Sequence, residues 1–478
     1  MSAIELLKAD PVVVARRDEI VAGLRALVDD DALIADEDGR RAFDTDALTA
    51  YRRMPLAVVL PHTTKQVSDV LSYCNAQGVR VIPRGAGTSL SGGALPSEDA
   101  VVVGVSKMNQ VLDVDTANRT ARVQTGITNL AISAAVAPDK FFYAPDPSSQ
   151  LACTLAGNLA MNSGGAHCLK YGVTSNNILG LTIVLMNGEV IEIGGKELDS
   201  AGYDFLGMII GAEGQFGIVT EATVRILRQA EGARPMLIGF DGAEDAGACV
   251  TAIIGAGIVP VAIEYMDRPA IRVCEDYANA GYPLDCEAML IVEVEGAESE
   301  IDALLARITE IVSAHNPRVV RTSSSDAETA AIWKGRKAAF SAVGRLADYF
   351  CMDGTIPISE LPRVLSGISE IGASYGLQIA NIFHAGDGNL HPLILYNSDI
   401  DGELEKAEAC GADILRLCVD VGGCLTGEHG VGIEKRDLMT VQYSRVDLMQ
   451  QIRLRDVFDP AWLLNPGKVF PLDLSQAA

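Results

Sequence analysis

Two histidines that flank a glycine-rich turn have types and spacing suited to metal chemistry. The stretch NIFHAGDGNLHPLIL places His384 and His391 at the ends of two apolar, strand-like runs, and residues 386–389 have the composition of a tight turn. If those four residues form the loop, His384 faces His391 across an antiparallel pair, with Cβ atoms about 5 Å apart. Two imidazoles at that distance can chelate one metal ion.

A third candidate ligand lies in the stretch GEHGVGIEK, where Glu428 and His429 are adjacent. Neighbouring side chains in a glycine-flanked segment need not point the same way, so one can bind a metal ion while the other acts on a substrate. Two histidines and one carboxylate leave an open coordination position, which is the arrangement of a catalytic metal site. The alternative is that these are unrelated core or surface residues.

A glycine-rich loop, PRGAGTSLSGG at residues 83–93, is the strongest binding motif of the first half. Its glycines and the hydroxyl residues Thr88, Ser89 and Ser91 follow a predicted strand, which is the composition of a backbone nest for phosphate. Leu90 breaks the dinucleotide pattern GxGxxG, and the P-loop pattern GxxxxGK[ST] does not occur. A Rossmann NAD site and a P-loop are therefore disfavoured, and a flexible turn without a ligand stays as the alternative.

Two more clusters of small residues follow in the same half, TLAGNLAMNSGG at residues 154–165 and GAEGQFGIVT at residues 211–220. Three such clusters predict a long ligand that the backbone approaches at separated points, such as a dinucleotide with a tricyclic ring. Ordinary turns of an α+β domain are the alternative.

The elements that must position these motifs are predicted from periodicity and turn residues. Residues 1–50 have a helical, acidic pattern. A strand at LAVVL, a helix at residues 64–77 and a strand at VRVIP lead into the glycine loop. The strands VVVGV, ARVQTG, ILGLTIVLMNGEVIEIG and GIVTEATVRILR follow, the third with a hairpin turn at Asn187-Gly188. After a polar linker at residues 229–235, the strands MLIGF, AIEYM and AMLIVEVEG alternate with amphipathic helices such as residues 300–315.

Composition excludes several classes of protein. The 478 residues are 49% hydrophobic and 21% charged, which indicates two or three compact globular units. The formal net charge of -25 argues against a nucleic-acid partner, which needs clustered Lys and Arg. No apolar run approaches the length of about 18 residues that spans a bilayer, and the N-terminus lacks the apolar core of a signal peptide. We therefore expect a cytoplasmic protein whose ten cysteines, without a CxxC pair, are reduced thiols rather than iron–sulfur ligands.

The glycine clusters and the GEHGVGIEK stretch resemble the vanillyl-alcohol-oxidase type of FAD-linked oxidases, and within it the group formed by the FAD-binding subunit of bacterial glycolate oxidase and by D-lactate dehydrogenase, over residues 20–471. The resemblance implies an α+β fold with a PCMH-type FAD-binding domain of two α+β subdomains at residues 55–230. A ferredoxin-like α+β cap domain for the substrate follows at residues 231–421. Helical segments at residues 1–54 and 422–478 complete the chain, and the second returns to the FAD domain.

The resemblance also implies a bound FAD. Its candidate contacts lie in the glycine clusters, in the nearby turns or in the C-terminal turn NPGK, and they are Pro83, Arg84, Gly85, Ala86, Gly87, Thr88, Ser89, Gly92, Gly93, Pro145, Ser148, Thr154, Gly157, Asn158, Ser163, Gly164, Tyr171, Gly172, Glu213, Gly217, Ile218, Val219, Asn465 and Lys468. Relatives with covalent flavin carry a histidine in the diphosphate loop. None occurs in residues 83–93, so we expect non-covalent FAD, with His167 as the nearest exception. Lys468 is expected to stabilise a reduced, anionic flavin, and a solvated lysine on a surface turn is the alternative.

In the second half, the resemblance assigns a divalent metal ion, with zinc favoured, to His384, His391 and Glu428, the role of catalytic base to His429, and the substrate carboxylate to Arg336. A guanidinium binds both oxygens of a carboxylate. Lys334 and Lys337 lie beside Arg336, and sequence alone would treat them as solvated helix charges. A substrate hydroxyl bound to the ion would give its proton to the base, and hydride would pass to the flavin.

The expected activity is the FAD-dependent oxidation of glycolate or D-lactate to the 2-oxo acid, because the similarity runs through KAAFSAVGRLADYFCMDGTIP. The substrate is expected between the domains. The alternatives are a D-2-hydroxyglutarate-type dehydrogenase, an FAD-binding subunit of a multi-subunit glycolate oxidase that is inactive alone, and a metal-dependent hydrolase that uses the same metal residues. Iron–sulfur partner subunits or a membrane-linked electron acceptor, a peripheral position at the inner membrane through them, and a homo-oligomer are further expectations.

Overall fold

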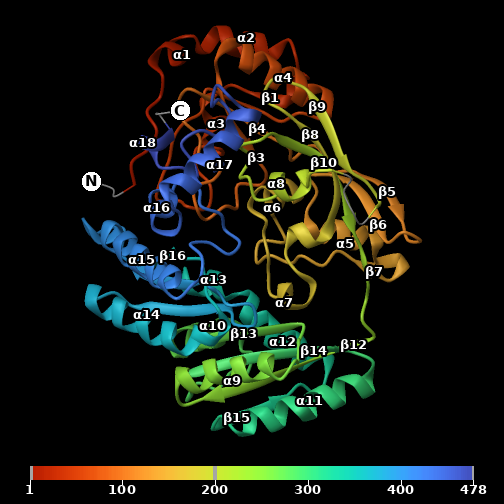
Figure 1. The fold of residues 1–478 in the computed structure, drawn as a ribbon, viewed down its shortest axis with the longest axis vertical. Coiled ribbons are helices and arrows are strands. Elements are labelled where there is room, and N and C mark those ends of the chain that lie inside the picture. The colour runs from red at the N-terminus through yellow and green to blue at the C-terminus, as the bar shows by residue number, and fades with distance from the viewer. Residues whose placement is uncertain (1–3, 198–201, 476–478) are drawn as a thin grey trace. The chain divides into compact units, whose positions relative to one another are not determined.

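The structure of the protein, a computed structural model, describes residues 4–197 and 202–475, so the outermost residues of both predicted terminal segments lie outside it. The chain folds into two compact units (Figure 1). We call residues 4–164, 172–229 and 428–475 the N-terminal unit, and residues 165–171 and 230–427 the central unit. Of the predicted C-terminal segment, residues 428–475 belong to the N-terminal unit, whereas residues 422–427 belong to the central unit.

The N-terminal unit contains short helices and two larger sheets. Its elements, in chain order, are α1 Pro11–Ala15, α2 Arg17–Arg25, β1 Leu33–Ile34, α3 Glu37–Arg41, β2 Ala57–Val59, α4 Thr64–Gln77, β3 Arg80–Arg84, β4 Ala100–Gly104, β5 Val111–Asp115, β6 Thr120–Gln124, α5 Asn129–Val136, β7 Phe141–Phe142, α6 Leu155–Met161, β8 Ile178–Val184, β9 Val190–Gly194, α8 Phe205–Ile209, β10 Ile218–Arg225, β11 Leu227–Arg228, α16 Met439–Gln442, α17 Arg445–Phe458 and α18 Leu472–Ser475.

The two larger sheets of this unit correspond to two α+β subdomains. In the first, ordered β1-β2-β4-β3, strands β2, β4 and β3 are parallel and β1 is antiparallel to β2. In the second, ordered β5-β6-β10-β8-β9, all neighbouring strands are antiparallel. This arrangement agrees with the predicted pair of α+β subdomains.

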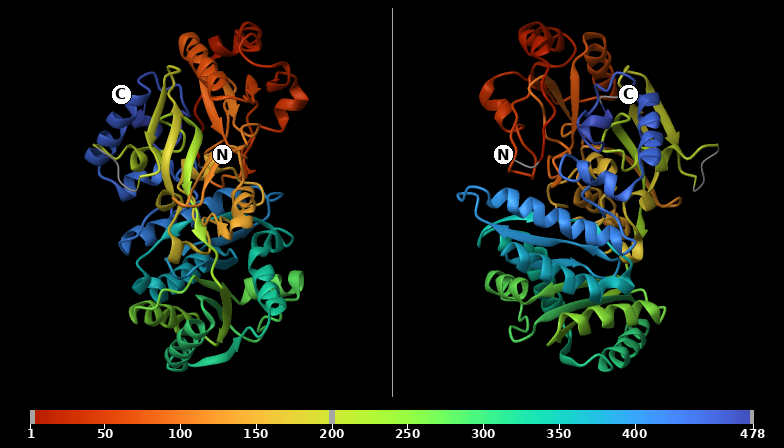
Figure 2. Two further views of the ribbon diagram at one scale, coloured as in Figure 1. Left: turned by 90° about the vertical axis from the view of Figure 1, so that its right-hand side faces the viewer. Right: turned by 60° about the vertical axis from the view of Figure 1, so that its left-hand side comes forward.

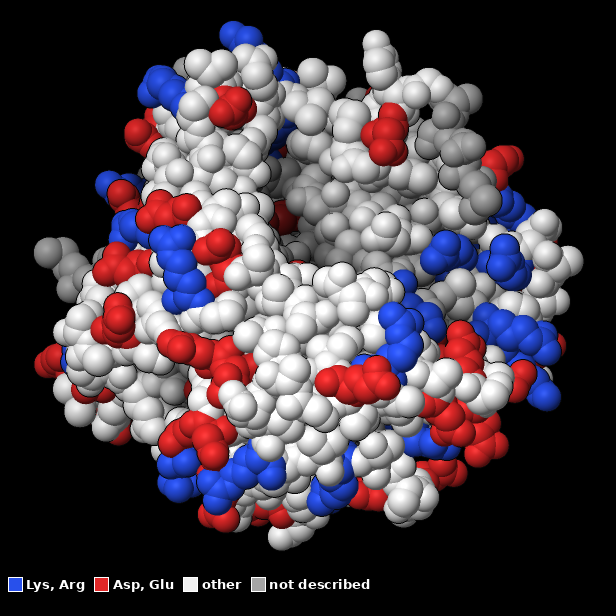
Figure 3. All heavy atoms as spheres, turned by 60° about the horizontal axis from the view of Figure 1, so that its bottom comes forward, with Lys and Arg blue, Asp and Glu red and all other residues white. Residues whose placement is uncertain are grey.

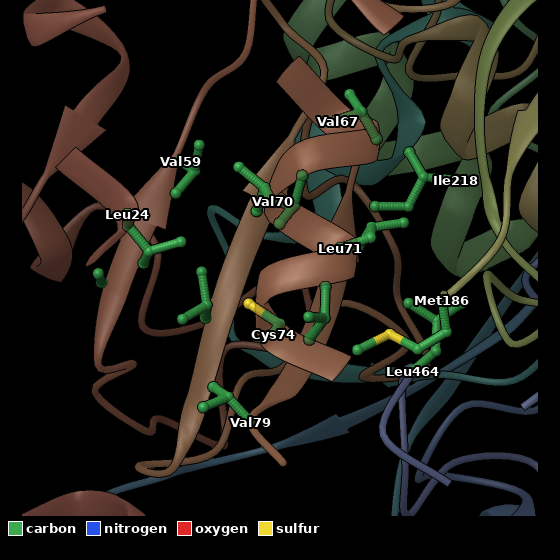
Figure 4. Packing of buried hydrophobic residues seen from close by; sticks show 14 of the residues in the cluster. Leu24, Val59, Val67, Val70, Leu71, Cys74, Val79, Met186, Ile218 and Leu464 are labelled. Atoms are coloured by element: carbon green, nitrogen blue, oxygen red, sulfur yellow. The ribbon is translucent and has the colours of Figure 1, made fainter. Parts of the chain in front are cut away.

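Helix α4 forms where the sequence predicts it and packs into the core between the sheets. The Thr63 side chain accepts a hydrogen bond from the N–H of Gln66 at its start, and Gly78 ends it in the left-handed conformation. Its apolar residues recur at helical spacing, and they contact buried residues of β2, β10 and the C-terminal segment, as Figure 4 shows for Val67, Val70, Leu71 and Cys74. The predicted Asn187-Gly188 hairpin turn is also present, because the N–H of Leu185 donates to the carbonyl of Glu189 between β8 and β9.

The central unit is built on one large sheet. Its elements are α7 Cys168–Tyr171, β12 Gly232–Phe240, α9 Ala243–Gly255, β13 Ala262–Asp267, α10 Arg268–Ala278, β14 Ala288–Gly296, α11 Glu298–Ser313, β15 Pro317–Thr322, α12 Asp326–Lys337, α13 Ala339–Val343, β16 Asp348–Cys351, β17 Gly354–Thr355, α14 Leu361–Tyr375, β18 Ile379–His384, β19 Asn389–Leu390, β20 Pro392–Tyr396 and α15 Glu403–Asp420.

The first four strands of this unit have the ferredoxin-like order. Strands β15, β12, β14 and β13 are neighbours in that order and antiparallel, so the fourth, first, third and second strands of the unit lie side by side. Strand β18 extends the sheet next to β13 and pairs with both β19 and β20; β17 then pairs with β19, and β16 pairs with β20. Helices α11, α9, α14 and α15 contact one another in a row (Figure 1), and α15 lies along the outer strands (Figure 2). The predicted ferredoxin-like cap is therefore confirmed.

The surface charge and the hydropathy of the helices agree with the composition, which indicates a globular protein. Figure 3 shows a face on which Lys and Arg side chains are interspersed with Asp and Glu side chains. Among the residues described, no helix is both long and apolar enough to cross a membrane.

Candidate active site

The hairpin that carries the two histidines forms in the central unit, but with a register that differs from the predicted one. His384 is the last residue of β18 and pairs with Asn389, not with His391, and Asn381 pairs with Pro392. The loop is therefore residues 385–388, one position earlier than the predicted loop 386–389. The partner of His384 moves by two residues, from the predicted His391 to Asn389. Because a two-residue shift leaves the side-chain face unchanged, the two histidines still share one face of the sheet. Their ring centroids lie 5.2 Å apart with the rings perpendicular.

A buried glutamate of the adjacent strand orients the first histidine. Glu264 in β13 pairs with His384 of β18, and Nδ1 of His384 lies 2.7 Å from Oε1 of Glu264. A carboxylate only accepts hydrogen bonds, so Nδ1 carries the proton and the lone pair of the ring lies on Nε2, the form that binds a metal ion. Burial by itself raises the pKa of Glu264, but the charge of Arg336 and the contact with His384 outweigh it and hold that pKa below its ordinary value.

The same carboxylate binds the predicted substrate arginine. Nη2 of Arg336, in α12, lies 2.5 Å from Oε2 of Glu264, and the side chains are 4% and 0% exposed. Arg336 is therefore buried, whereas Lys334 and Lys337 are exposed, as expected of solvated helix charges. Nε and Nη2 of Arg336 are buried, and neither has a hydrogen-bond partner among the described residues, so the contact of Nη2 with Glu264 is an ion pair. A buried guanidinium with N–H groups that lack partners can donate hydrogen bonds to an incoming carboxylate, and little further desolvation of the arginine is needed.

The second histidine lies beside a buried aspartate. Nε2 of His391 is 3.2 Å from Oδ1 of Asp353, which is 0% exposed. The other oxygen of Asp353 accepts hydrogen bonds from the Thr426 hydroxyl at 2.5 Å and from the N–H of Gly427 at 2.9 Å. Asp353 therefore ties the histidine hairpin to the end of the segment that precedes Glu428.

In the N-terminal unit, the three glycine clusters meet. A Cβ atom on Gly85 would lie 2.3 Å from Oγ1 of Thr154, so only glycine fits where the loop crosses the start of α6. The N–H groups of Gly211 and Glu213 donate to the carbonyls of Leu159 and Ala160, each at 2.8 Å. Sequence predicted three approach points for one long ligand, and the fold brings them into a single region.

The C-terminal turn closes this region with buried polar groups. Nδ2 of Asn465 donates to the carbonyls of Gly93 at 3.1 Å and Glu213 at 2.7 Å. Nζ of Lys468 donates to the carbonyl of Leu95 at 3.0 Å and to Oδ1 of Asn465 at 3.2 Å, and the residue is 4% exposed. Burial lowers the pKa of Lys468 to about 8, against the opposing charges of Asp46 and Glu213. The alternative interpretation of Lys468 as a solvated surface lysine is therefore wrong.

The other predicted FAD contacts are spread over three kinds of position. Ala86 and Ser148 are exposed, and Pro83, Gly87, Thr88 and Ser89 are half-buried. Ile218 and Val219 point into the two cores of the unit. Buried or partly buried backbone and capping positions are held by Arg84, Gly92, Pro145, Gly157, Asn158, Ser163, Gly164, Gly172 and Gly217.

One predicted contact lies in the other unit. Tyr171 belongs to α7 of the central unit, where its hydroxyl donates to Glu295. In the same short segment, Nε2 of His167 is 3.3 Å from Oε2 of Glu293, and the indole of Trp333 donates to the other oxygen of Glu293 at 2.7 Å. Residues 165–171 are thus fastened to β14 of the central unit.

Glu428 and His429 belong to the N-terminal unit, whereas His384 and His391 belong to the central unit. Oε2 of Glu428 accepts a hydrogen bond of 2.9 Å from the N–H of Gly164. The predicted ligand set thus draws on both units, and its assembly stays a prediction.

Sequence reasoning missed Glu264 and Asp353. Glu264 is the one charged residue in the otherwise apolar interior of the predicted strand AIEYM, and Asp353 lies within CMDGTIP. A carboxylate inside an apolar strand was the available signal for Glu264, because a buried charge is normally paired. Its partners, however, are known only once β13 and β18 are paired.

Comparison with known proteins gives the same division of the chain. A family model described as "FAD binding domain" matches residues 55–194, and one described as "FAD linked oxidases, C-terminal domain" matches residues 230–469. The glycolate oxidase subunit GlcD of Escherichia coli (strain K12) is 46% identical over 95% of this chain and 90% of its own. The D-lactate dehydrogenase of Anaerostipes hadrus is 29% identical over 98% of this chain and 99% of its own.

A solved structure shares the fold at lower identity. The crystal structure of p-cresol methylhydroxylase with substrate bound superposes with a TM-score of 0.83, covers 98% of this chain and 99% of its own, and is 16% identical. At that identity the likeness concerns the fold alone, and it agrees with a PCMH-type FAD-binding fold.

Proposed function

The chain belongs to the FAD-linked oxidases, and we propose that it oxidises a small 2-hydroxy acid, glycolate or D-lactate, to the 2-oxo acid. One observation carries the choice of substrate: Arg336 and His384 are bonded to the same buried carboxylate of Glu264. A 2-hydroxy acid has its carboxylate and hydroxyl on neighbouring carbons. A guanidinium and a metal-binding imidazole on the same carboxylate match those two groups in chemistry.

Arg336 binds the substrate carboxylate in this proposal. Its Nη2 forms an ion pair with Oε2 of Glu264, so the guanidinium is already buried beside this carboxylate before substrate arrives. Its buried Nε supplies a further donor. Because the side chains of Arg336 and Glu264 are already buried, substrate binding needs little reorganisation of the site.

His384, His391 and Glu428 hold a divalent metal ion, with zinc favoured. The donor set fits such an ion: two buried imidazoles share one sheet face, and the carboxylate of Glu264 sets the tautomer of the first. A bound ion would lower the pKa of the substrate hydroxyl. His429 then takes the hydroxyl proton on a ring nitrogen.

A bound FAD would supply a hydride acceptor for C2 of the substrate, so that a carbonyl would be left at that carbon. Non-covalent binding is supported by the absence of histidine from residues 83–93. The proposed contacts are those that the resemblance implies, and the meeting of the three glycine clusters in one region supports the contacts that lie in them. The charge of Lys468, buried beside Asn465, favours the reduced cofactor.

Electrons are proposed to leave through partner subunits that carry iron–sulfur clusters or through a membrane-linked acceptor, with the protein held peripherally at the membrane by those partners. The support is that the E. coli relative is itself named a subunit of glycolate oxidase.

The test is anaerobic reduction of the purified, FAD-loaded protein by glycolate, D-lactate, L-lactate and D-2-hydroxyglutarate, followed by the visible flavin absorbance. Ethylene glycol, which lacks the carboxylate, is the matched control. Bleaching by glycolate or D-lactate and not by ethylene glycol is expected. Bleaching only by D-2-hydroxyglutarate favours that alternative substrate. Loss of bleaching after chelation, with the flavin retained, is expected if the metal takes part.

Two alternatives differ in that assay. An FAD-binding subunit that needs its partners stays yellow with every acid. A metal-dependent hydrolase predicts a colourless protein, and this alternative is set aside because the chain is an FAD-linked oxidoreductase.

A further inference from the structure

Residues 429–433, which begin with the proposed base His429, form a segment outside any helix or strand. We call it the base segment. An irregular segment has no ladder of backbone hydrogen bonds to fix it, so its position depends on other partners. Three distant parts of the N-terminal unit supply them: Ser91, Glu213 and the C-terminal turn, where the N–H of Val469 donates to the carbonyl of Gly432 at 2.9 Å.

Ser91 of the glycine loop holds both ends of the base segment. Its hydroxyl donates to the carbonyl of His429 at 3.0 Å, and its own carbonyl accepts a hydrogen bond of 2.9 Å from the N–H of Ile433. Ser91 is 0% exposed. Ser91 lies 338 positions before His429 in the chain, in the loop predicted to hold the flavin diphosphate. Its hydrogen bonds therefore connect that loop to the base segment.

Glu213 holds the middle of the base segment. Its Oε1 accepts a hydrogen bond of 2.6 Å from the N–H of Val431, and its Oε2 accepts one of 2.8 Å from the N–H of Gly432. The residue is 4% exposed and has a left-handed backbone with φ +50. Charge-assisted hydrogen bonds to two successive amides are strong and directional. A buried glutamate held in a costly backbone conformation is consistent with a dedicated positioning role.

We propose that Ser91 and Glu213 are positioning residues that clamp the base segment onto the glycine loop and thereby fix the imidazole of His429 relative to the flavin site. The inference rests on the proposed role of His429 as the base. The clamp gives Ser91 a role beyond its place in the predicted phosphate-binding loop, and it gives Glu213 a role beyond its predicted contact with FAD.

The experiment uses the full-length, FAD-loaded protein and the variants Ser91→Ala and Glu213→Gln. The matched controls are Ser68→Ala, which removes a hydroxyl bonded to the carbonyl of Gly188, and Glu221→Gln, which changes a partly exposed carboxylate paired with Arg122. Hydrogen exchange is measured by mass spectrometry on peptides that cover residues 428–434. Both clamp variants should exchange there about 10-fold faster than the wild type, as expected for the loss of one hydrogen bond, and the controls should not.

Steady-state kinetics give the second readout. Displacing a base should lower kcat for the 2-hydroxy acid by about 10- to 100-fold, while KM stays unchanged. The FAD content should stay unchanged in Ser91→Ala, because Ser91 is not one of the predicted FAD contacts. A purely structural role would instead lower FAD content or stability without this split. If Glu213→Gln does not fold, Ser91→Ala, which loses a single hydrogen bond, carries the test.

Three outcomes decide the matter. Unchanged exchange of residues 428–434 in the folded variants overturns the clamp whatever the activity. Faster exchange with an unchanged kcat overturns the positioning role. If the wild type oxidises no 2-hydroxy acid, the proposed function fails, and the exchange data alone still decide whether the clamp exists.

Discussion

Arg336 and Glu264 form a buried ion pair, with Nη2 and Oε2 2.5 Å apart and the two side chains 4% and 0% exposed. The same carboxylate accepts a hydrogen bond from Nδ1 of His384. Glu264 therefore contacts both the proposed substrate arginine and a proposed metal ligand. A substitution of Arg336 or of His384 should therefore affect the other residue through this carboxylate.

Replacing Arg336 by lysine should raise KM for the 2-hydroxy acid by about 10- to 100-fold, because an ammonium keeps the charge but loses the paired donors of the guanidinium. Arg336→Ala should raise KM further and should also cost about 3–5 kcal/mol of stability, since Glu264 is left as an unpaired buried charge. Initial rates and urea unfolding measure the two effects. Lys334→Ala, an exposed cation on the same helix, is the control. An unchanged KM in Arg336→Lys would remove this residue from the substrate site.

Glu264→Gln should weaken metal binding by about 10- to 100-fold, because the amide no longer fixes the tautomer of His384. Titration of the metal-stripped protein with zinc measures the affinity. Glu287→Gln is the matched control in the same unit, since its carboxylate pairs with Arg268 at the surface, 2.8 Å away. Equal zinc affinity in the wild type and in Glu264→Gln would show that His384 is not oriented for a metal by this carboxylate.

Gly388→Ala should destabilise the histidine hairpin by about 3 kcal/mol, because alanine is strained in the left-handed conformation and its Cβ meets a backbone oxygen. Gly388 has φ +78, and a Cβ there would lie 2.3 Å from the carbonyl oxygen of Ile356. Gly402 has φ +87 with nothing within 4 Å, so Gly402→Ala should cost only about 1 kcal/mol. Chemical unfolding of the two variants compares them, and equal costs would contradict the close contact.

Local features of the fold could be predicted from the sequence. The capping threonine, apolar spacing and following glycine define α4, and the Asn187-Gly188 turn defines the hairpin of β8 and β9. These signals lie within a few residues of one another, so the helix and the hairpin can be predicted without knowledge of tertiary contacts. The domain boundaries and the roles of individual site residues stay predictions.

Features that depend on distant residues could not be predicted. Composition favoured residues 386–389 as the loop, but Asn389 joins β19 opposite His384, and the positive φ of Gly388 falls on the last loop residue instead. The partners of Glu264 come from α12 and β18, and the second of them, His384, lies 120 residues further along the chain. Only the order of strands in the sheet brings them together. The burial of Lys468 likewise depends on contacts with Leu95.

Asp46→Asn should change how stability depends on pH. Burial raises the pKa of Asp46 to about 6, although the N–H groups of Ala94 and Leu48 oppose the shift. The folded protein then holds this proton more tightly than the unfolded chain, so stability falls as pH rises from about 4 to about 6, by on the order of 3 kcal/mol. Asparagine does not titrate. The unfolding free energy of the variant relative to the wild type should therefore increase across that range, and a constant difference would contradict the raised pKa.

Lys468→Met should lower the reduction potential of the bound flavin by about 30 mV or more, which for a two-electron couple corresponds to about 1.4 kcal/mol of lost stabilisation of the reduced form. The reason is that methionine keeps the volume and burial of the side chain but removes its charge. Because burial lowers the pKa of Lys468 only to about 8, the amine is still protonated at neutral pH, and the difference from the variant should shrink as pH rises above that value. Equilibrium titration against reference dyes measures the potential.

Lys65→Met makes the same substitution at an exposed lysine that pairs with Asp69, and it should leave the potential unchanged. If Lys468→Met also leaves the potential unchanged while the FAD content is intact, the ammonium does not act on the flavin. Lys468 would then have only a structural role. Its hydrogen bonds to Leu95 and Asn465 would attach the C-terminal turn to the glycine loop and would offset the free energy needed to bury the charge.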